Sequence, residues 1–284
     1  MQSLTFDAIG TGWQLDTVEP IEPGLAAAIA ARIDGFDATW SRFRENSLVS
    51  RIAVTPGVWE FPDDAPALFD VYRRLYLATD GAVSPLVGAA MDDLGYDRTY
   101  SLRPTGRTVA APAWDDAVAW DGHALTTLRP VSVDVGAAGK GYLVDIVSGM
   151  LAEAGHEDFT VDGSGDIRRH GPTPIRVALE HPLDTSMAIG VAVVDAAICS
   201  SATNRRTWGD GLHHVIDATT GLPTDSVIAT WAIAATALEA DGLATALFFA
   251  DPARLSREFD FTWVRMLRDG TVEFSPHLKG EIFA

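Results

Sequence analysis

Residues 133–142 read Val-Asp-Val-Gly-Ala-Ala-Gly-Lys-Gly-Tyr. This stretch is the strongest local indication of both the fold and a binding site. The short β-rich run Val131–Val135 predicts a strand that includes Asp134, and the small residues after it predict a tight turn into a helix that begins near Lys140. Glycines let a ligand approach the backbone closely, and a helix N-terminus that carries a lysine favours an anion. The stretch matches neither the P-loop pattern nor the G-x-G-x-x-G fingerprint, so an ordinary strand-to-helix junction is the alternative. Of the 21 basic residues only Lys140 and Lys279 are lysines, which makes a lysine between two glycines conspicuous.

Periodicity on both sides of this stretch predicts helices and short strands in mixed order. Apolar residues at helical spacing predict helices over 25–40, 68–77, 143–151 and 238–249. Residues 4–17 and 261–274 each predict a pair of strands joined by a glycine turn. The other predicted strands are Arg107–Ala111, Ala124–Leu128, Phe159–Val161, Ile175–Leu179, Ala188–Val194, His214–Ile216 and Ile228–Ala235. Because strands often follow one another without a helix between them, we expect an α+β fold in which 1–284 form a single domain with mixed, mainly antiparallel sheets and packed helices.

The overall composition excludes several classes of function. The 284 residues carry a formal net charge of −18 at pH 7, so the basic surface that nucleic acids require is missing. Cys199 is the single cysteine, which rules out an intrachain disulfide. The N-terminus lacks the features of a secretory signal, and no apolar stretch reaches transmembrane length. We therefore expect no nucleic-acid partner, no transmembrane segment and a cytoplasmic location.

The predicted helix 238–249 carries a possible metal site. Asp241 and Thr245 are four residues apart, so their side chains project from one face of the helix. A carboxylate and a hydroxyl, with a backbone carbonyl nearby, form part of the oxygen shell that suits Mg²⁺ when waters and substrate phosphate complete it. The alternative is a capped helix with a contact between the two side chains.

Two further segments contain residues that carry chemistry. His213 and His214 are adjacent on a predicted strand, so they point to opposite sides, and one of them near a phosphate could serve as acid, base or hydrogen-bond donor. A surface histidine beside a turn is an equally good interpretation. Residues 162–166, Asp-Gly-Ser-Gly-Asp, resemble a phosphate- or metal-binding turn, but the segment is short and a plain β-turn is the better interpretation.

Taken in order, these pieces resemble the ApbE family of FAD:protein FMN transferases, from about Ile9 to Phe249. Residues 134–145 are similar to the family pattern D-L-G-G-I-A-K-G-Y-A-V-D, and residues 235–245 fit P-T-x-x-x-A-D-x-x-x-T. Residues 41–51, Ser-Arg-Phe-Arg-Glu-Asn-Ser-Leu-Val-Ser-Arg, resemble S-x-Y-x-x-D-S-x-x-S-R. Weaker similarities are Ile9–Thr11 to M-G-T, Gly81–Gly88 to G-A-F-D-P-T-V-G, Leu94–Tyr96 to W-G-F, Val161–Ile167 to V-N-x-G-G-D-I, Ser200–Ala202 to T-S-G and His214–Pro223 to H-I-I-D-P-x-T-G-x-P.

The resemblance implies both a fold and a reaction. It implies an ApbE or T-fold-like architecture, FAD as substrate, Mg²⁺ as cofactor, and a partner protein whose threonine or serine hydroxyl receives FMN while AMP is released. The metal would be held by Asp241, Thr245 and the main-chain carbonyl of Ala137. His214 and Lys140 would be catalytic. Contacts to FAD would come from Ile9, Phe43, Ala82, Val83, Ser84, Asp134 and Lys140.

The chain departs from the family pattern in the flavin-contact segments. Phe43 stands where the family has tyrosine, and Val83-Ser84 stands where it has Phe-Asp, so two polar contacts to FAD are missing. The metal and phosphate positions are intact. Two alternative functions are a Mg²⁺-dependent FAD pyrophosphatase that releases FMN and AMP, and a non-catalytic FAD-binding protein.

Overall fold

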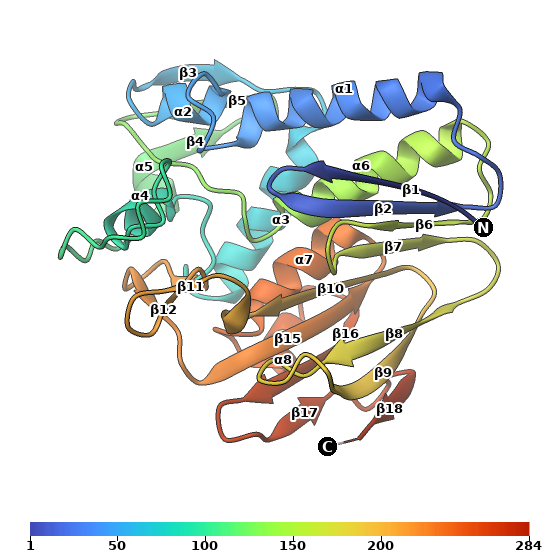
Figure 1. The fold of residues 1–284 in the computed structure, drawn as a ribbon. Coiled ribbons are helices and arrows are strands. Elements are labelled where there is room, and N and C mark those ends of the chain that lie inside the picture. Colours follow the sequence, from blue (N-terminus) through green and yellow to red (C-terminus); the bar gives the residue numbers. More distant parts are fainter. Residues whose placement is uncertain (284) are drawn as a thin grey trace.

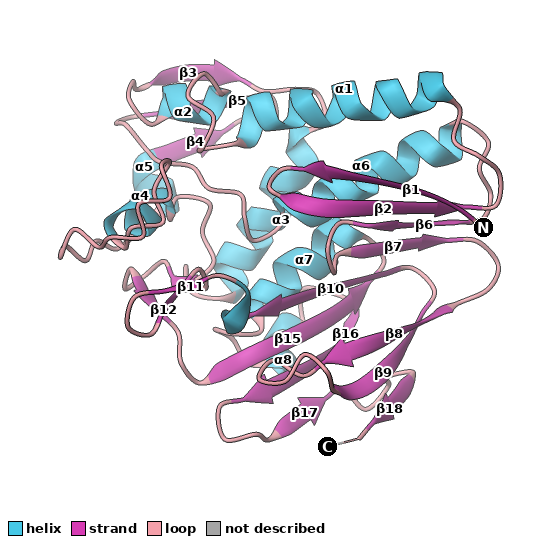
Figure 2. Ribbon diagram, in the orientation of Figure 1, coloured by secondary structure: helices cyan, strands magenta, loops and turns pink. Residues whose placement is uncertain are grey.

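The computed structural model describes residues 1–283, and its central feature is an open sheet of eight strands (Figures 1 and 2). Across the sheet these are β1 (Gln2–Ala8), β2 (Thr11–Thr17), β6 (Phe159–Asp162), β7 (Ile167–His170), β10 (Ala197–Ala202), β15 (Val227–Ala234), β16 (Phe261–Leu267) and β17 (Val272–Phe274). Neighbouring strands run antiparallel throughout, with β1 and β17 at the edges. The expected α+β class with mainly antiparallel pairing is confirmed.

Helices cover one face of this sheet. The long ones are α1 (Pro23–Trp40), α3 (Ala65–Ala78), α6 (Gly139–Glu153) and α7 (Ala237–Ala246). Helix α6 packs on β6 and β7, α7 packs on β10 and β15, and α1 and α3 pack against α6 and α7 respectively. Short helices complete the chain: α2 (Leu48–Ile52), α4 (Gly88–Asp93), α5 (Trp114–Ala117), α8 (Pro252–Leu255) and the 3₁₀ turn η1 (Thr203–Arg205).

A small sheet covers part of the other face. It consists of β18 (Gly280–Ile282), β9 (Ala188–Val194) and β8 (Ile175–Glu180), in that order. Its apolar side chains, such as Leu179 and Ile189, form a second core with Ile198 and Trp231 of the main sheet. Strand β15 lies in the middle layer, which explains why its sequence, Val-Ile-Ala-Thr-Trp-Ala-Ile-Ala, is apolar on both faces.

Three smaller sheets lie outside these layers. One contains β3 (Gly57–Glu60), β5 (Ala124–Thr127) and β4 (Val118–Trp120). The other two are ribbons, β11 (Thr207–Trp208) with β12 (Leu212–His213), and β13 (Ile216–Asp217) with β14 (Leu222–Pro223). Among residues 1–283 no helix combines the length and apolar character needed to cross a bilayer.

Three of the predicted strands are wrong. Arg107–Ala111 and Val131–Val135 lie outside any strand, and His214–Ile216 is interrupted because His214 and Val215 lie between β12 and β13. The Val131–Val135 segment is instead fixed by two backbone hydrogen bonds, from Asp134 to Pro85 at 2.8 Å and from Gly88 to Ser132 at 3.2 Å. Alternating valines therefore predict extended backbone here correctly, but the segment does not pair with another strand in a sheet within residues 1–283.

Candidate active site

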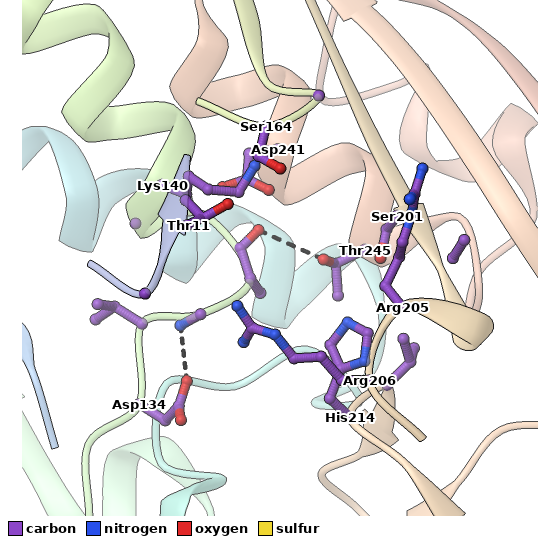
Figure 3. A pocket seen from close by; sticks show the side chains of 18 of the residues that line it. Thr11, Asp134, Lys140, Ser164, Ser201, Arg205, Arg206, His214, Asp241 and Thr245 are labelled. Carbon is purple, nitrogen blue, oxygen red and sulfur yellow. Dashed lines mark hydrogen bonds between the residues drawn. The ribbon is translucent and has the colours of Figure 1, made fainter. Parts of the chain in front are cut away.

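A pocket of about 1390 Å³ opens where the N-terminus of α6 and one side of α7 meet β10 and the surrounding loops (Figure 3). Every residue to which the family resemblance assigned a metal, FAD or catalytic role lines it. These are Ile9, Phe43, Ala82, Val83, Ser84, Asp134, Ala137, Lys140, His214, Asp241 and Thr245. Tertiary folding therefore brings segments from the whole length of the chain to one cavity.

Close packing of α6 against α7 places the three residues expected to hold a metal. A Cβ atom on Gly141 would lie 2.1 Å from the Ala237 carbonyl oxygen and 2.6 Å from the Asp241 Cβ, so only glycine allows this approach. The Gly141 amide donates a hydrogen bond of 2.8 Å to Asp241 Oδ2. One turn along α7, the Thr245 hydroxyl lies 3.4 Å from the Ala137 carbonyl oxygen (Figure 3). A carboxylate, a hydroxyl and a carbonyl oxygen thus lie side by side.

The charges around these oxygens fit a divalent cation. Asp241 is 6% exposed and Asp166 is fully buried beside it, and Lys140 is the cation closest to both. Burial raises the pKa of Asp241 well above its usual range, and the Asp166 carboxylate raises it further. Asp241 therefore keeps a proton unless a cation is close by, and a hard, oxygen-only ligand set of this kind is what Mg²⁺ prefers. Residues 1–283 contain no cluster of three or more His, Cys, Asp or Glu side chains arranged for a metal, so any site here depends on the hydroxyl and the carbonyl.

Lys140 lies on the floor of the pocket with two oxygen partners. Its ammonium group donates to the Gly163 carbonyl at 2.8 Å and lies 2.5 Å from Asp166 Oδ2. Burial alone would lower the pKa of Lys140, but the carboxylates of Asp166 and Asp241 outweigh burial and raise it. Lys140 is therefore a fixed positive charge at neutral pH.

Asp134 is held rigidly at the edge of the pocket. Its Oδ1 atom accepts a 2.7 Å hydrogen bond from the Gly136 amide (Figure 3), and its Oδ2 atom is paired with Arg42 Nε at 2.5 Å. The Arg42 guanidinium is itself buried and also contacts Asp92 at 2.9 Å and the Tyr96 carbonyl at 2.6 Å. Arg42 thus connects Asp134 to the loop that follows α4.

The residues expected to contact the flavin differ in how much of their surface is accessible from the pocket. Ile9 lies in the turn between β1 and β2 with a φ of 45°, and Phe43 is partly exposed. The segment 82–84 is almost entirely buried, and its polar groups have internal partners: Ala82 O accepts from Ala218 N at 3.0 Å, and the Ser84 hydroxyl accepts from Leu86 N at 3.2 Å. Only a small part of this segment reaches the cavity.

His214 points into the pocket (Figure 3), and its neighbour His213 is not among the residues that line it. The His213 ring lies 2.8 Å from the Thr224 carbonyl oxygen, on the other side of the chain. Burial, assisted by the positive charge of Arg206, lowers the pKa of His214 to about 4. The imidazole of His214 is therefore neutral at neutral pH, and its Nδ1 atom has no hydrogen-bond partner within residues 1–283.

Three charged residues in or under the pocket were given no role by the sequence patterns: Asp166, Arg205 and Arg206. Asp166 lies in the turn between β6 and β7, where Gly165 N donates to Asp162 Oδ1 at 2.8 Å, so the predicted β-turn is present and also places a carboxylate under Lys140. Arg205 and Arg206 follow β10 and line the opposite wall (Figure 3). The Asp-Gly-Ser-Gly-Asp turn was a usable signal for Asp166, whereas nothing local distinguishes the two arginines from surface residues.

The fold and the pocket define a class of protein: an α+β protein with a large polar cavity in which buried carboxylates, a lysine and arginines surround space for an anionic ligand. The family model described as "ApbE family" matches residues 9–260. The chain belongs to the ApbE family.

Relatives and solved structures agree with this assignment. The chain is 26% identical over 272 residues to the FAD:protein FMN transferase of Klebsiella pneumoniae, covering 87% of this chain and 77% of that protein. It is also 26% identical over 268 residues to the Vibrio cholerae FAD:protein FMN transferase, covering 86% and 80%. The fold is similar to that of the Thermotoga maritima ApbE crystal structure, with a TM-score of 0.81, 24% identity and 97% coverage of both chains.

Proposed function

We propose that this chain is a Mg²⁺-dependent FAD:protein FMN transferase that moves FMN from FAD to a threonine or serine hydroxyl of another protein and releases AMP. The observation that carries the proposal is the meeting of Asp241, Thr245, the Ala137 carbonyl and Lys140 in one pocket of a chain of this family. We also propose that residues 1–284 act as a single domain and that the protein is cytoplasmic.

The floor of the pocket would bind the diphosphate of FAD. Asp241, Thr245 and the Ala137 carbonyl would hold Mg²⁺, which when bound supplies Lewis-acid stabilisation of charge on phosphate oxygens. Lys140 would contact the same phosphates, because its ammonium retains an unused N–H beyond its bond to Gly163 and its pairing with Asp166. Asp134, Ile9, Phe43 and the segment 82–84 would position the rest of the dinucleotide.

The transfer exchanges a phosphoanhydride bond of FAD for a phosphoester bond to the acceptor. The acceptor hydroxyl oxygen forms a bond to the FMN phosphorus, the phosphoanhydride bond to AMP breaks, and the hydroxyl proton leaves. The neutral imidazole of His214 would accept a hydrogen bond from the acceptor hydroxyl and take up its proton as the new bond forms. Lys140 would offset the charge that develops on the leaving AMP.

A single incubation tests the proposal against its alternatives. The protein is mixed with FAD, Mg²⁺ and a candidate acceptor protein that carries an exposed threonine, and the products are analysed by mass spectrometry and chromatography. We expect an acceptor heavier by one FMN group and an equal amount of AMP, both abolished when Mg²⁺ is chelated. Free FMN and AMP with an unmodified acceptor would instead show a pyrophosphatase, and bound but intact FAD would show a binding protein.

A further inference from the structure

A stack of aromatic and guanidinium groups lines part of the pocket. The Phe43 ring lies parallel to the Tyr100 ring, with centroids 4.8 Å apart and an interplanar angle of 6°. The Arg42 guanidinium lies 4.3 Å from the centroid of Phe43, and Tyr96 packs edge-on against both Phe43 and Tyr100. Phe43, which the sequence pattern marked as a flavin contact, therefore packs against Arg42, Tyr96 and Tyr100 and keeps only part of its surface for the pocket.

Tyr100 is the outermost member of this stack. Its side chain is 51% exposed and lines the pocket, so one side of the ring packs on Phe43 while the other is open to the cavity. Large aromatic side chains usually bury most of their surface, and an exposed one at the mouth of a pocket is available for a ligand.

The backbone holds Tyr100 in this place at the expense of conformational freedom. Tyr100 has a φ of 51° and Leu102 a φ of 53°, a left-handed conformation that bulky residues rarely adopt. The Asp97 carboxylate stabilises the turn by accepting hydrogen bonds from the amides of Thr99 at 2.8 Å and Ser101 at 3.1 Å. Strained backbone that is fixed by several bonds is typical of segments that present a side chain to a ligand.

We infer that Tyr100 is a specificity-determining residue of the dinucleotide site, on which a flat aromatic ring of bound FAD stacks. The inference rests on the proposed function, because that function supplies a ligand with two flat rings, adenine and isoalloxazine. A dinucleotide whose phosphates are bound at Lys140 has a ring free to reach the wall of the same cavity. The structure assigns the stacking contact to Tyr100, and Phe43 becomes the support behind it.

The test measures ligand affinity directly, without turnover. FAD, FMN and AMP are titrated separately into the wild-type protein and into Tyr100→Asn, Tyr100→Phe and Phe274→Ala in the presence of Mg²⁺. Asparagine tolerates the left-handed backbone, so Tyr100→Asn removes the ring while keeping the turn. Phe274 is 48% exposed on β17, outside the pocket, and controls for loss of an exposed aromatic ring.

Stacking of a nucleobase on an aromatic side chain predicts that Tyr100→Asn binds FAD about tenfold more weakly, while Tyr100→Phe and Phe274→Ala stay within about twofold of wild type. A loss confined to FMN identifies isoalloxazine as the stacked ring, and a loss confined to AMP identifies adenine; either supports the inference. If isoalloxazine is the ring, Tyr100→Asn also restores fluorescence that the tyrosine quenches in bound FMN.

Equal or tighter FAD binding by Tyr100→Asn would overturn the inference. So would a variant that binds FAD normally but needs more acceptor protein, because Tyr100 would then belong to the acceptor site. The proposed function fails separately, when the wild-type protein binds FAD but transfers no FMN. In that case a tenfold loss of FAD affinity in Tyr100→Asn would still support stacking.

Discussion

The floor and the rim of the pocket are built on different principles. The floor, which comprises Gly141, Lys140, Asp166, Asp241 and Thr245, is buried or half-buried and is held by the packing of α6 on α7, by the β6–β7 turn and by short polar contacts. The rim, which comprises residues 97–102, Arg205, Arg206 and His214, lies on loops and short ribbons. The floor charges are fixed by two packed helices and a short turn between paired strands, whereas the rim groups lie on longer connecting segments.

The largest effect is expected from a change that separates α6 from α7 beneath the pocket. Gly141→Ala places a methyl group against the Ala237 carbonyl, and we expect it to destabilise the protein by about 2–3 kcal/mol and to abolish transfer. Denaturant unfolding and the transfer assay measure both effects. The matched control is Gly149→Ala in the same helix, where nothing lies within 4 Å of the added Cβ. That control should be neutral or slightly stabilising, since alanine is the better helix former.

Removing the charge of Asp241 should affect the transfer activity strongly and the stability of the protein little. We expect Asp241→Asn to lower the transfer rate about 1000-fold while leaving the metal-free protein as stable as wild type, because the change relieves repulsion with Asp166. The control is Glu239→Gln on the same helix, whose carboxylate pairs with Arg74 at 2.9 Å outside the pocket. Full activity of Asp241→Asn over a range of Mg²⁺ concentrations would contradict the proposed metal site.

Asp166 tests whether the floor positions Lys140. In Asp166→Asn the Lys140 ammonium keeps its hydrogen bond to the Gly163 carbonyl but loses its carboxylate partner. We expect kcat to fall about 10- to 100-fold, with a smaller change in KM for FAD. Asp158→Asn, which removes a 2.6 Å ion pair with Arg169 outside the pocket, is the control. Unchanged kinetics in Asp166→Asn would show that Lys140 does not need this partner.

The smallest effect concerns His214 at the rim and appears in the pH dependence of stability. Its pKa falls from 6.5 in the unfolded chain to about 4 in the folded protein, so the unfolded state binds the extra proton between these values. Stability from the neutral imidazole is therefore present above about pH 6.5 and lost as the pH falls toward 4. Allowing for partial exposure, we expect a loss of about 1–2 kcal/mol in the free energy of unfolding.

Unfolding experiments at pH 4.5 and 7 compare wild type with His214→Asn. In His214→Asn the free energy of unfolding should change less between the two pH values than in wild type. His123→Asn, at an exposed position, should show the same change as wild type. Identical slopes in wild type and His214→Asn would contradict the lowered pKa. In the transfer assay His214 should contribute no titration between about pH 5.5 and 7.5, since the imidazole is neutral throughout.

The secondary structure that local patterns predict well is the part stabilised by local chemistry. The helix predicted over 25–40 is α1, which begins at Pro23 because proline fits the first helical turn, and the β1–β2 hairpin closes around Gly10 with a φ of 78°. Strand β10, Ala-Ile-Cys-Ser-Ser-Ala, was not predicted although it is central. Its residues have little strand preference of their own, and pairing with β7 and β15 decides its conformation.

The sequence by itself determined the family, the α+β class and the polar groups that short spacings place together, such as Asp241 and Thr245 on one face of α7. Tertiary structure alone decided that Asp166 lies under Lys140 and that Tyr100 covers Phe43. Helical and strand periodicity follow from bonds between near neighbours in the chain. Contacts between distant segments depend instead on how whole layers pack, and no local pattern encodes that packing.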